Sequence, residues 1–307
     1  MLVSPPIIEE REIHEPLFCG PGPCNLLPSV RQALTKPVMS PMCEVYFSAM
    51  AEIRAGLKYA FQTKSDLVLA ISGSGHSGME AVINNLLGPD DTLLIASRGI
   101  WDQRAYIMAT RYGIKTFKTE VPINATFSFE QIENELKKLK PTALFITHGD
   151  SSTGSVQNLN GLGKICHKCF YIPRYHHTQS PPMVWALRCC LMELCKETLP
   201  KSWARHAATT AHFQKKIQDY GFEFFIPKPE DRLATVTTVV IPKRCKSDEY
   251  LRYMREKHDI VMFGGLGPTA GKVLRVGIMG VNSHVEIATK VANAMADTAR
   301  AVMKSSI

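Results

Sequence analysis

Residues 67–87, with the sequence LVLAISGSGHSGMEAVINNLL, decide the fold of this chain. The apolar run at 67–71 is typical of a buried strand, the segment at 72–76 is a tight turn rich in glycine and serine, and residues 78–87 have the composition of a helix. A strand, a glycine turn and a helix in that order direct the free N–H groups of the helix start toward an anion. The stretch therefore predicts a phosphate-binding cup.

These residues leave three interpretations of the cup open. Gly73, Gly75 and Gly78 match the G-x-G-x-x-G pattern of dinucleotide sites. That pattern requires an acidic residue about 20 positions further on, whereas Ser97-Arg98 stands there, which would suit only a 2′-phosphorylated cofactor. The second interpretation is a phosphorylated vitamin-type cofactor held by a single phosphate. The third is a glycine-rich turn without a ligand.

Composition indicates an ordinary globular protein. With 307 residues, 45% of them hydrophobic and 21% charged, the chain can bury one large core or form two domains. The net charge of +8 would suit nucleic acid, but lysine and arginine are scattered and the densest cluster, residues 137–140, resembles the end of a solvated helix. We therefore expect no nucleic-acid partner. No apolar run reaches the roughly 18 residues of a membrane span, so we expect no membrane partner either.

The cysteines indicate a reducing compartment. Their number, nine, is odd, and Cys189 and Cys190 are adjacent, so a disulfide framework is not expected. Cys166 and Cys169 form a lone C-x-x-C pair without a second pair at zinc spacing. Buried thiols explain this pair better than a metal or redox site, and we predict no metal ligands.

An alternation of strands and helices continues after the cup. Strands are expected at 92–96, 115–119 and 143–147, with one helix that opens at 99–104 and another at 129–139. Trp101 lies at the carboxyl end of a strand, where ligands of parallel sheets collect, and it can either stack on a cofactor ring or be a half-buried interface residue. The loop at 148–154, with its histidine, glycines and hydroxyls, follows another strand end. Two such loops on one edge favour a shared site.

The pattern breaks after residue 169. Residues 170–173 are too short for a buried strand and end in proline, so the sheet is expected to be incomplete. The remainder predicts a small α+β domain with helices at 183–196, 202–220, 248–257 and 285–303 and strands at 222–226, 236–241, 261–263 and 273–277. Within the last strand, Arg275 is unfavourable unless paired, so it is a candidate for binding a carboxylate or for an internal ion pair.

Seven motifs, taken together, resemble a known family. They are GPGP at 20–23, SGSGH at 72–76, GIW at 99–101, THGDSSTG at 147–154, YHHT at 175–178, GGLGP at 264–268 and LRVG at 274–277. In this order they resemble the alanine–glyoxylate (serine–pyruvate) aminotransferases, which are pyridoxal-phosphate enzymes of fold type I. A dehydrogenase would explain only the first cup.

This resemblance implies an α/β large domain with a mostly parallel sheet at residues 1–185 and a small α+β domain at 186–307. It also implies pyridoxal 5′-phosphate as cofactor, amino-acid and 2-oxo-acid substrates, and a homodimer. The cofactor-binding residues by resemblance are Ser74, Gly75, His76, Trp101, Ser151, Tyr175 and Thr178, of which Tyr175 and Thr178 would reach the phosphate of the other subunit. Arg275 would hold the substrate carboxylate, with Asn25 in the loop over it, and Cys24 stands where the family usually has serine.

One departure from the family lies between about residues 169 and 174. Family members there carry an aspartate that pairs with the pyridine nitrogen, and further on a Ser/Thr-Gly-(Ser/Ala)-Gln-Lys segment whose lysine forms the Schiff base. This sequence has neither, and Lys272 belongs to a motif that the family has in addition. No catalytic residue can therefore be assigned, and we expect a shortened, inactive or impaired aminotransferase. The alternative is a non-catalytic dimer partner that modulates a full-length sibling.

The expected location is intracellular. The family resemblance suggests the peroxisome, whereas the final Ser305-Ser306-Ile307 matches the peroxisomal Ser-Lys-Leu ending poorly and leaves the cytoplasm open.

Overall fold

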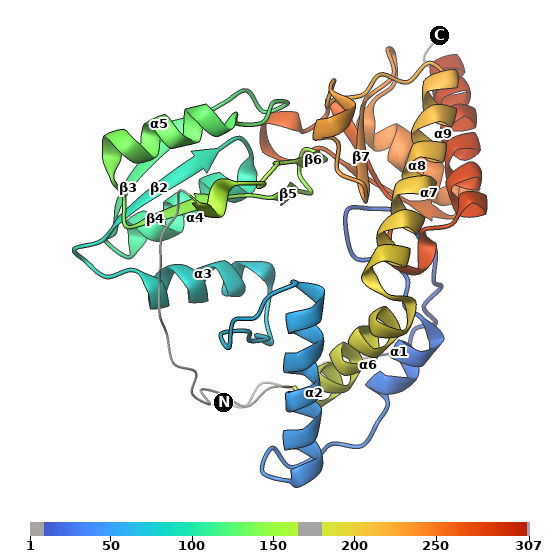
Figure 1. Ribbon diagram of the computed structural model, residues 1–307. Coiled ribbons are helices and arrows are strands. Elements are labelled where there is room, and N and C mark those ends of the chain that lie inside the picture. Colours follow the sequence, from blue (N-terminus) through green and yellow to red (C-terminus); the bar gives the residue numbers. More distant parts are fainter. Residues whose placement is uncertain (1–8, 165–179, 306–307) are drawn as a thin grey trace, which may run out of the picture.

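The computed structural model describes residues 9–164 and 180–305 and contains two three-stranded sheets (Figure 1). The first sheet has the order β3-β2-β4, all parallel, with β2 at Thr92–Ser97, β3 at Lys115–Glu120 and β4 at Ala143–Ile146. Its central strand β2 is almost fully buried, as its apolar sequence predicts. The architecture confirms an α/β region with a parallel sheet.

Helices cover both faces of this sheet. The helices α3 (Gly75–Leu86) and α4 (Ile100–Arg111) share one apolar cluster with it, and α5 (Phe129–Leu139) packs on the opposite face. Ser128 begins α5 by accepting a hydrogen bond from the backbone N–H of Gln131, whose side chain in turn accepts one from the N–H of Ser128. The helix ends at Lys140 in the left-handed conformation.

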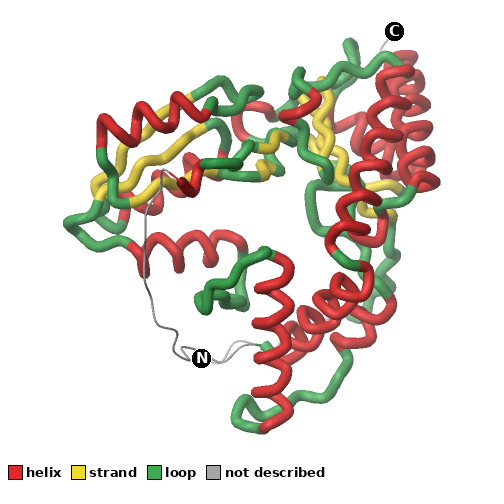
Figure 2. The backbone as a smooth tube through the Cα atoms, in the orientation of Figure 1, coloured by secondary structure: helices red, strands yellow, loops and turns green. Residues whose placement is uncertain are grey.

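The strand expected at 67–71 does not form, and that prediction is wrong. The segment is a loop between α2 (Glu44–Ala60) and α3, visible in Figure 2, in which Leu69 and Ile71 are 63% and 40% exposed. The reason is geometric, because an apolar strand is stable only beside another strand. The sheet stops at β4, and no described strand lies beyond it.

The second sheet is antiparallel and has the order β7-β10-β9, with β7 at Val236–Val240, β10 at Val273–Gly277 and β9 at Phe263–Gly264. Three helices, α7 (Leu199–Asp219), α8 (Ser247–His258) and α9 (Val285–Ser305), bury the largest apolar cluster against it. The hydroxyl of Tyr250 is buried there and donates to the carbonyl of Met295 at 2.7 Å. The expected small α+β unit is thus present.

Two short pairings complete the strands. β1 (Leu17–Phe18) runs parallel to β8 (Ile260–Val261), and β5 (Gly149–Asp150) pairs with β6 (Ser155–Val156) in a hairpin. The strand expected at 222–226 is wrong, since only an isolated bridge between Phe224 and Val239 forms. A 3₁₀ turn lies at Leu162–Lys164, and Cys166 and Cys169 lie outside the described residues.

Helix α6 (Pro181–Glu197) connects the two halves of the chain. It packs against α1 (Pro28–Leu34) and α2, and it continues without a break across residues 185 and 186. The chain turns into α7 at Thr198, which has a positive φ of 73°. In the described part, none of the helices has the length and apolar character needed to cross a membrane.

Gly277 in β10 provides a test of how closely the segment at 19–20 packs on the antiparallel sheet. A Cβ atom at Gly277 would lie 1.8 Å from the carbonyl oxygen of Gly20, because the backbone of the 19–20 segment lies directly on the strand. We expect Gly277→Ala to lower the free energy of unfolding in urea by about 1–3 kcal/mol. Gly78→Ala in α3 is the matched control, since no atom outside its chain neighbours and its own helix backbone lies within 4 Å of its Cβ position. It should be neutral or stabilise by up to about 1 kcal/mol, and equal losses for both variants would contradict the close contact.

Candidate functional site

The start of α3 has the geometry expected of the phosphate cup, although the strand before it is absent. Ser74 is the N-cap, and its Oγ accepts a hydrogen bond from the N–H of Ser77 at 3.3 Å. Residues 71–75 are exposed, and the space beside the Cα of Gly75 is open. The remaining N–H groups of the first turn therefore face solvent and can bind an anion. His76 follows in the same turn.

The start of α4 is fixed by a buried carboxylate, that of Asp102. Its Oδ2 accepts hydrogen bonds from the N–H groups of Arg98 and Gly99, each at 3.0 Å, and its Oδ1 accepts one from the hydroxyl of Thr147. Burial raises the pKa of Asp102, and these hydrogen bonds oppose that rise. Asp102 thereby connects the helix start to the end of β4 and fixes the position of Trp101.

Trp101 lies in the first turn of α4 and is half-buried. The guanidinium of Arg104 lies over its indole ring, 4.9 Å from the centroid. One face of the ring thus carries a cation, and the opposite face is the one that can receive a flat ligand. The predicted stacking role stays a prediction.

The hairpin loop at 147–154 places a second buried carboxylate beside α4. Asp150 Oδ1 accepts hydrogen bonds from the N–H and the hydroxyl of Ser152 at 2.7 and 2.6 Å. Its Oδ2 is buried, has no hydrogen-bond partner among the described residues and would lie 2.2 Å from a Cβ on Gly99. Glycine at position 99 is therefore required by the carboxylate of this loop.

Arg275 joins the same loop from β10. It is buried, its Nε donates to the carbonyl of Gly264 at 2.7 Å, and its Nη1 donates to the carbonyl of Ser151 at 3.0 Å. Burial lowers the pKa of the Arg275 guanidinium, and the charge of Asp150 opposes that shift. In the part of the chain that the structure describes, no ion pair joins Arg275 to a carboxylate and no hydrogen bond reaches its Nη2. The group is thus arranged to receive a carboxylate from a ligand.

Asn25 is fully hydrogen-bonded within the protein. Its Oδ1 accepts from the N–H of Phe18 at 2.9 Å and from Nδ2 of Asn282 at 2.8 Å, and its Nδ2 donates to Glu15 Oε1 and to the carbonyl of Pro16. In this arrangement Asn25 holds the 18–25 loop against the 3₁₀ turn at Gly280–Asn282. A contact with substrate would require one of these bonds to exchange.

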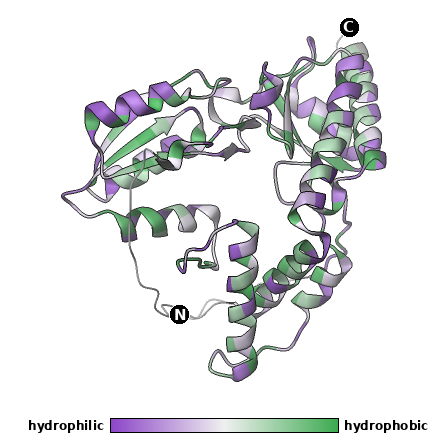
Figure 3. Ribbon diagram, viewed as in Figure 1, coloured by the Kyte–Doolittle hydropathy of each residue, from purple (hydrophilic) through white to green (hydrophobic). Residues whose placement is uncertain are grey.

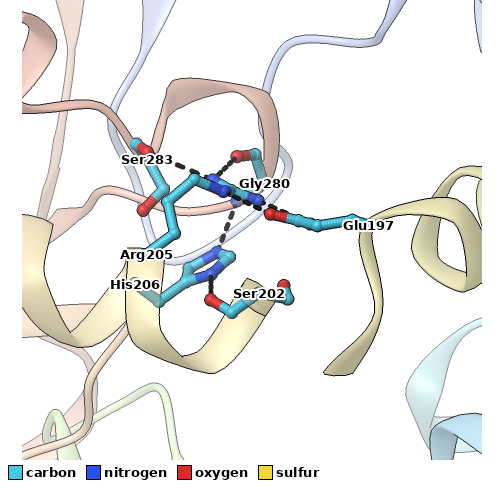
Figure 4. A network of polar contacts seen from close by, with 6 residues as sticks. All are labelled: Glu197, Ser202, Arg205, His206, Gly280 and Ser283. Carbon is cyan, nitrogen blue, oxygen red and sulfur yellow. Dashed lines mark hydrogen bonds and ion pairs between the residues drawn. The ribbon is translucent and has the colours of Figure 1, made fainter. Parts of the chain in front are cut away.

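A polar network supports that turn from the other side (Figure 4). Arg205 forms a two-pronged ion pair with Glu197, at 2.6 and 3.0 Å, and its Nη1 donates to the carbonyls of Gly280 and Ser283. His206 Nε2 accepts from the N–H of Gly280 at 3.0 Å, so its Nδ1 carries the proton donated to the carbonyl of Ser202. The network joins the α6–α7 corner to the turn that holds Asn25.

The structure brings some of the predicted residues together. Ser151 and Arg275 are hydrogen-bonded, and Trp101 begins the helix that Asp102 joins to the strand before Ser151. Ser74, Gly75 and His76 form the start of α3. Tyr175 and Thr178 lie outside the described residues.

Sequence reasoning missed several residues that position the site: Asp102, Glu197, Arg205, His206 and Asn282. Asp102 had a signal, because an acidic residue three positions after an N-cap is a helix-start signature. No sequence signal predicted the ion pair of Glu197 and Arg205, because the two residues lie on either side of a helix break. Asn282 meets Asn25 across most of the chain length, a contact that local patterns cannot predict.

Comparison with known proteins gives a consistent result. The model of the family described as Aminotransferase class-V matches residues 38–172. An alanine–glyoxylate aminotransferase of Oryctolagus cuniculus is 32% identical over 375 residues, covering 96% of this chain and 96% of the relative. One of Drosophila melanogaster is 30% identical and covers 93% of each. The rabbit alignment runs over 375 positions, 68 more than the 307 residues of this chain.

Solved structures agree in fold. The crystal structure of an alanine–glyoxylate aminotransferase from Nostoc sp. superposes with a TM-score of 0.89 at 28% identity, covering 95% of this chain and 97% of that one. A pyridoxamine–pyruvate aminotransferase from Mesorhizobium loti gives a TM-score of 0.88 at 18% identity, with coverage of 94% and 93%. At that identity the likeness concerns the fold alone.

The network around Glu197 predicts a pH dependence of stability. Hydrogen bonding to Arg205 lowers the pKa of Glu197 from its usual 4.5, against the opposing effect of burial. The carboxylate therefore contributes stability above about pH 4.5, and this is lost as the pH falls through the lower folded-state value. We expect Glu197→Gln to be less stable than the wild type at neutral pH and to lose less stability on acidification, measured by urea unfolding.

Glu193→Gln is the control for that experiment. Half-buried Glu193 pairs with exposed Lys196 on α6 at 3.5 Å, and such a pair near the surface contributes little. This variant should follow the wild-type pH profile. If Glu197→Gln also followed it, the ion pair with Arg205 would not stabilise the fold.

Proposed function

Because the chain belongs to the alanine–glyoxylate aminotransferase family, we propose that the activity it derives from this family is the transfer of an amino group from alanine or serine to glyoxylate or pyruvate. Pyridoxal phosphate is the proposed cofactor. The observation that carries this proposal is the 32% identity to the rabbit relative along 96% of both chains. The adjacent placement of Ser151 and Arg275 supports it, because a site for amino acids and 2-oxo acids must hold a carboxylate.

The described residues fit part of the cofactor. The exposed N–H groups at the start of α3, with open space at Gly75, suit its phosphate, the free face of Trp101 suits its ring, and Ser151 lies on the same sheet edge. When bound, pyridoxal phosphate supplies an electron sink for the substrate α-carbon. The protein would bind and orient the reactants, with Arg275 holding the carboxylate and Asp102 fixing the position of Trp101.

The sequence does not supply the residues that would form the covalent link to the cofactor and transfer protons. The sequence contains no Ser/Thr-Gly-(Ser/Ala)-Gln-Lys segment, and we propose that the family's lysine and its aspartate partner are missing with a block between about 169 and 174. At least 68 positions of the rabbit alignment have no residue of this chain opposite them, since 375 exceeds 307 by 68, and this supports the proposal. The parallel sheet, whose described strands end at β4, supports it too. A lysine of that kind gives acid–base help of about 10²–10⁴-fold. We infer that this shortened chain is inactive or strongly impaired.

The family resemblance also bears on the oligomeric state, the location and the domain boundary of this chain. We propose a homodimer in which Tyr175 and Thr178 contact the partner's cofactor phosphate. We also propose an intracellular location, either peroxisomal or cytoplasmic, and a boundary between a large and a small domain near residues 185 and 186.

A second candidate function is a non-catalytic dimer partner of a full-length sibling. The complete apolar core of the small unit favours it, because a folded surface is retained without the chemistry. It predicts co-purification with active enzyme.

Reductive labelling tests the missing chemistry. The chain is incubated with pyridoxal phosphate, reduced with borohydride and mapped by mass spectrometry, with a full-length family member as control. We expect one stoichiometrically modified lysine in the control and none in this chain, because its sequence lacks the anchoring segment. A single stoichiometric lysine in this chain would reveal a replacement residue and overturn the proposed inactivity.

Arg275 tests the carboxylate site independently of activity. We expect Arg275→Met to weaken pyruvate binding, followed by NMR, by about ten- to a hundredfold, because a charged hydrogen-bonded pair is lost. Arg275→Lys, which keeps the charge but not the two-pronged geometry, should fall between this variant and the wild type. Arg252→Met, at an exposed position on α8, is the control and should bind as the wild type does. Equal binding by all variants would remove Arg275 from the proposed site.

A further inference from the structure

The loop at 18–25 lies on the face of β10 from which Arg275 projects. The carbonyl of Gly20 occupies the space where a Cβ on Gly277 would lie, and residues two apart in a strand point to the same face. Phe263 is paired with Arg275 in register, and its ring lies directly against Gly20. The loop therefore lies beside the arginine on which the proposed carboxylate site depends.

The two ends of this loop are held in different ways. The first end is joined to β8 and β10 through Cys19, whose N–H donates at 2.9 Å and whose carbonyl accepts at 2.8 Å. The other end depends on Asn25, whose Oδ1 accepts from Nδ2 of Asn282 at 2.8 Å. The position of this second end is thus set by the 3₁₀ turn at Gly280–Asn282.

Helix α7 carries hydrophilic residues among hydrophobic ones, as Figure 3 shows, and two of the hydrophilic ones fix that turn at Gly280. The N–H of Gly280 donates to Nε2 of His206 at 3.0 Å, and its carbonyl accepts from Nη1 of Arg205 at 2.8 Å (Figure 4). The Sγ of Cys24 lies 3.2 Å from the position of a Cβ on Gly280, so the loop rests on the same residue. A change at His206 can therefore reach the loop through one turn.

We propose that His206 is a positioning residue for the carboxylate site and makes that site sensitive to acid. Neutral His206 accepts from Gly280 through Nε2, whereas both nitrogens of the protonated ring are donors, so protonation removes this hydrogen bond. Arg205 keeps its carbonyl partners, so the turn and the loop are loosened and not unfolded. This inference rests on the proposed function, because it concerns the site at Arg275.

Two charged side chains face His206. Glu197 at the end of α6 lies within electrostatic reach of it, and Arg205 is its neighbour on α7. Glu197 favours a proton on His206 and Arg205 opposes it. The turn itself has no titratable side chain, His284 beyond it is exposed, and Cys24 is the titratable residue that the loop brings to the turn. Because Glu197 and Arg205 form an ion pair, protonation of His206 leaves a net positive charge beside the turn.

Hydrogen exchange tests the hold on the loop without any ligand. Amides at 17–25 and 278–284, corrected for the intrinsic effect of pH, should lose protection by about three- to tenfold when one hydrogen bond is lost. The loss is expected between about pH 7.5 and about pH 5.5, where histidines ordinarily change charge. His206→Gln offers an oxygen acceptor and cannot gain a proton, so its protection should not change over this range.

His212→Gln is the matched control for both measurements. His212 is also a half-buried histidine of α7, but its Nε2 contacts the hydroxyl of Thr289 in α9 at 2.8 Å, away from the turn. This variant should follow the wild-type pH profile. Protection that falls equally in the wild type and in His206→Gln would assign the acid sensitivity to another group and overturn the proposal.

Pyruvate binding, followed by NMR, connects the loop to Arg275. Wild-type affinity should fall by about three- to tenfold over the same pH range, although a carboxylate of this kind stays ionised above about pH 4. His206→Gln should lose this pH dependence. His206→Leu has no acceptor, and with its fold verified by circular dichroism it should bind at every pH as weakly as the acidified wild type.

The outcomes separate this inference from the proposed function. If the wild type bound pyruvate equally well at both pH values, the carboxylate site would stand and the role of His206 would be overturned. If the wild type did not bind pyruvate at any pH, the proposed carboxylate site would itself be overturned, together with its dependence on His206. A pH dependence that persisted in His206→Gln would also overturn the role of His206.

Discussion

The backbone N–H and C=O groups of a strand in a parallel sheet point alternately to both sides, so a strand with one neighbour leaves half of them without a strand partner. Among the described residues β2 has a neighbour on each side, whereas β4, like β3, has a neighbour on one side only. Residues 67–71 have the composition of a buried strand and stay in a loop. Helix α3 keeps an apolar stripe that only part of the sheet covers. The side chains on these segments are suited to a wider sheet than the one they contact.

The carboxylate-binding end of the site is less affected, because different elements support it. Arg275 is positioned by backbone carbonyls of Gly264 and Ser151, and none of the described acidic side chains forms a direct ion pair with it. Buried Asp150 supplies a more distant negative charge. The proposed site thus combines an arginine arranged to bind a carboxylate with a cofactor region that, as we propose, lacks its covalent anchor.

Local patterns predicted the local structure well. The helix at 129–139 and the strand at 273–277 were placed with the bounds that the structure gives, because capping at Ser128 and the apolar run around Arg275 are local signals. The strand at 67–71 failed because its stability depends on neighbours that the pattern cannot supply. Within the site, the burial of Arg275 could be predicted from the apolar strand around it, whereas the hydrogen bond between Asn25 and Asn282 depends on tertiary contacts alone.

The pairing of β1 with β8 bears on the order in which the chain folds. Leu17 lies beside Ile260, and the N–H of Gly277 donates to the carbonyl of Cys19, so the segment at 17–19 is completed by residues that are made much later. Contacts of such sequence separation close late and slow folding. During synthesis the amino-terminal segment leaves the ribosome long before its partners exist, so the carboxyl-terminal unit can assemble only after translation has passed residue 277.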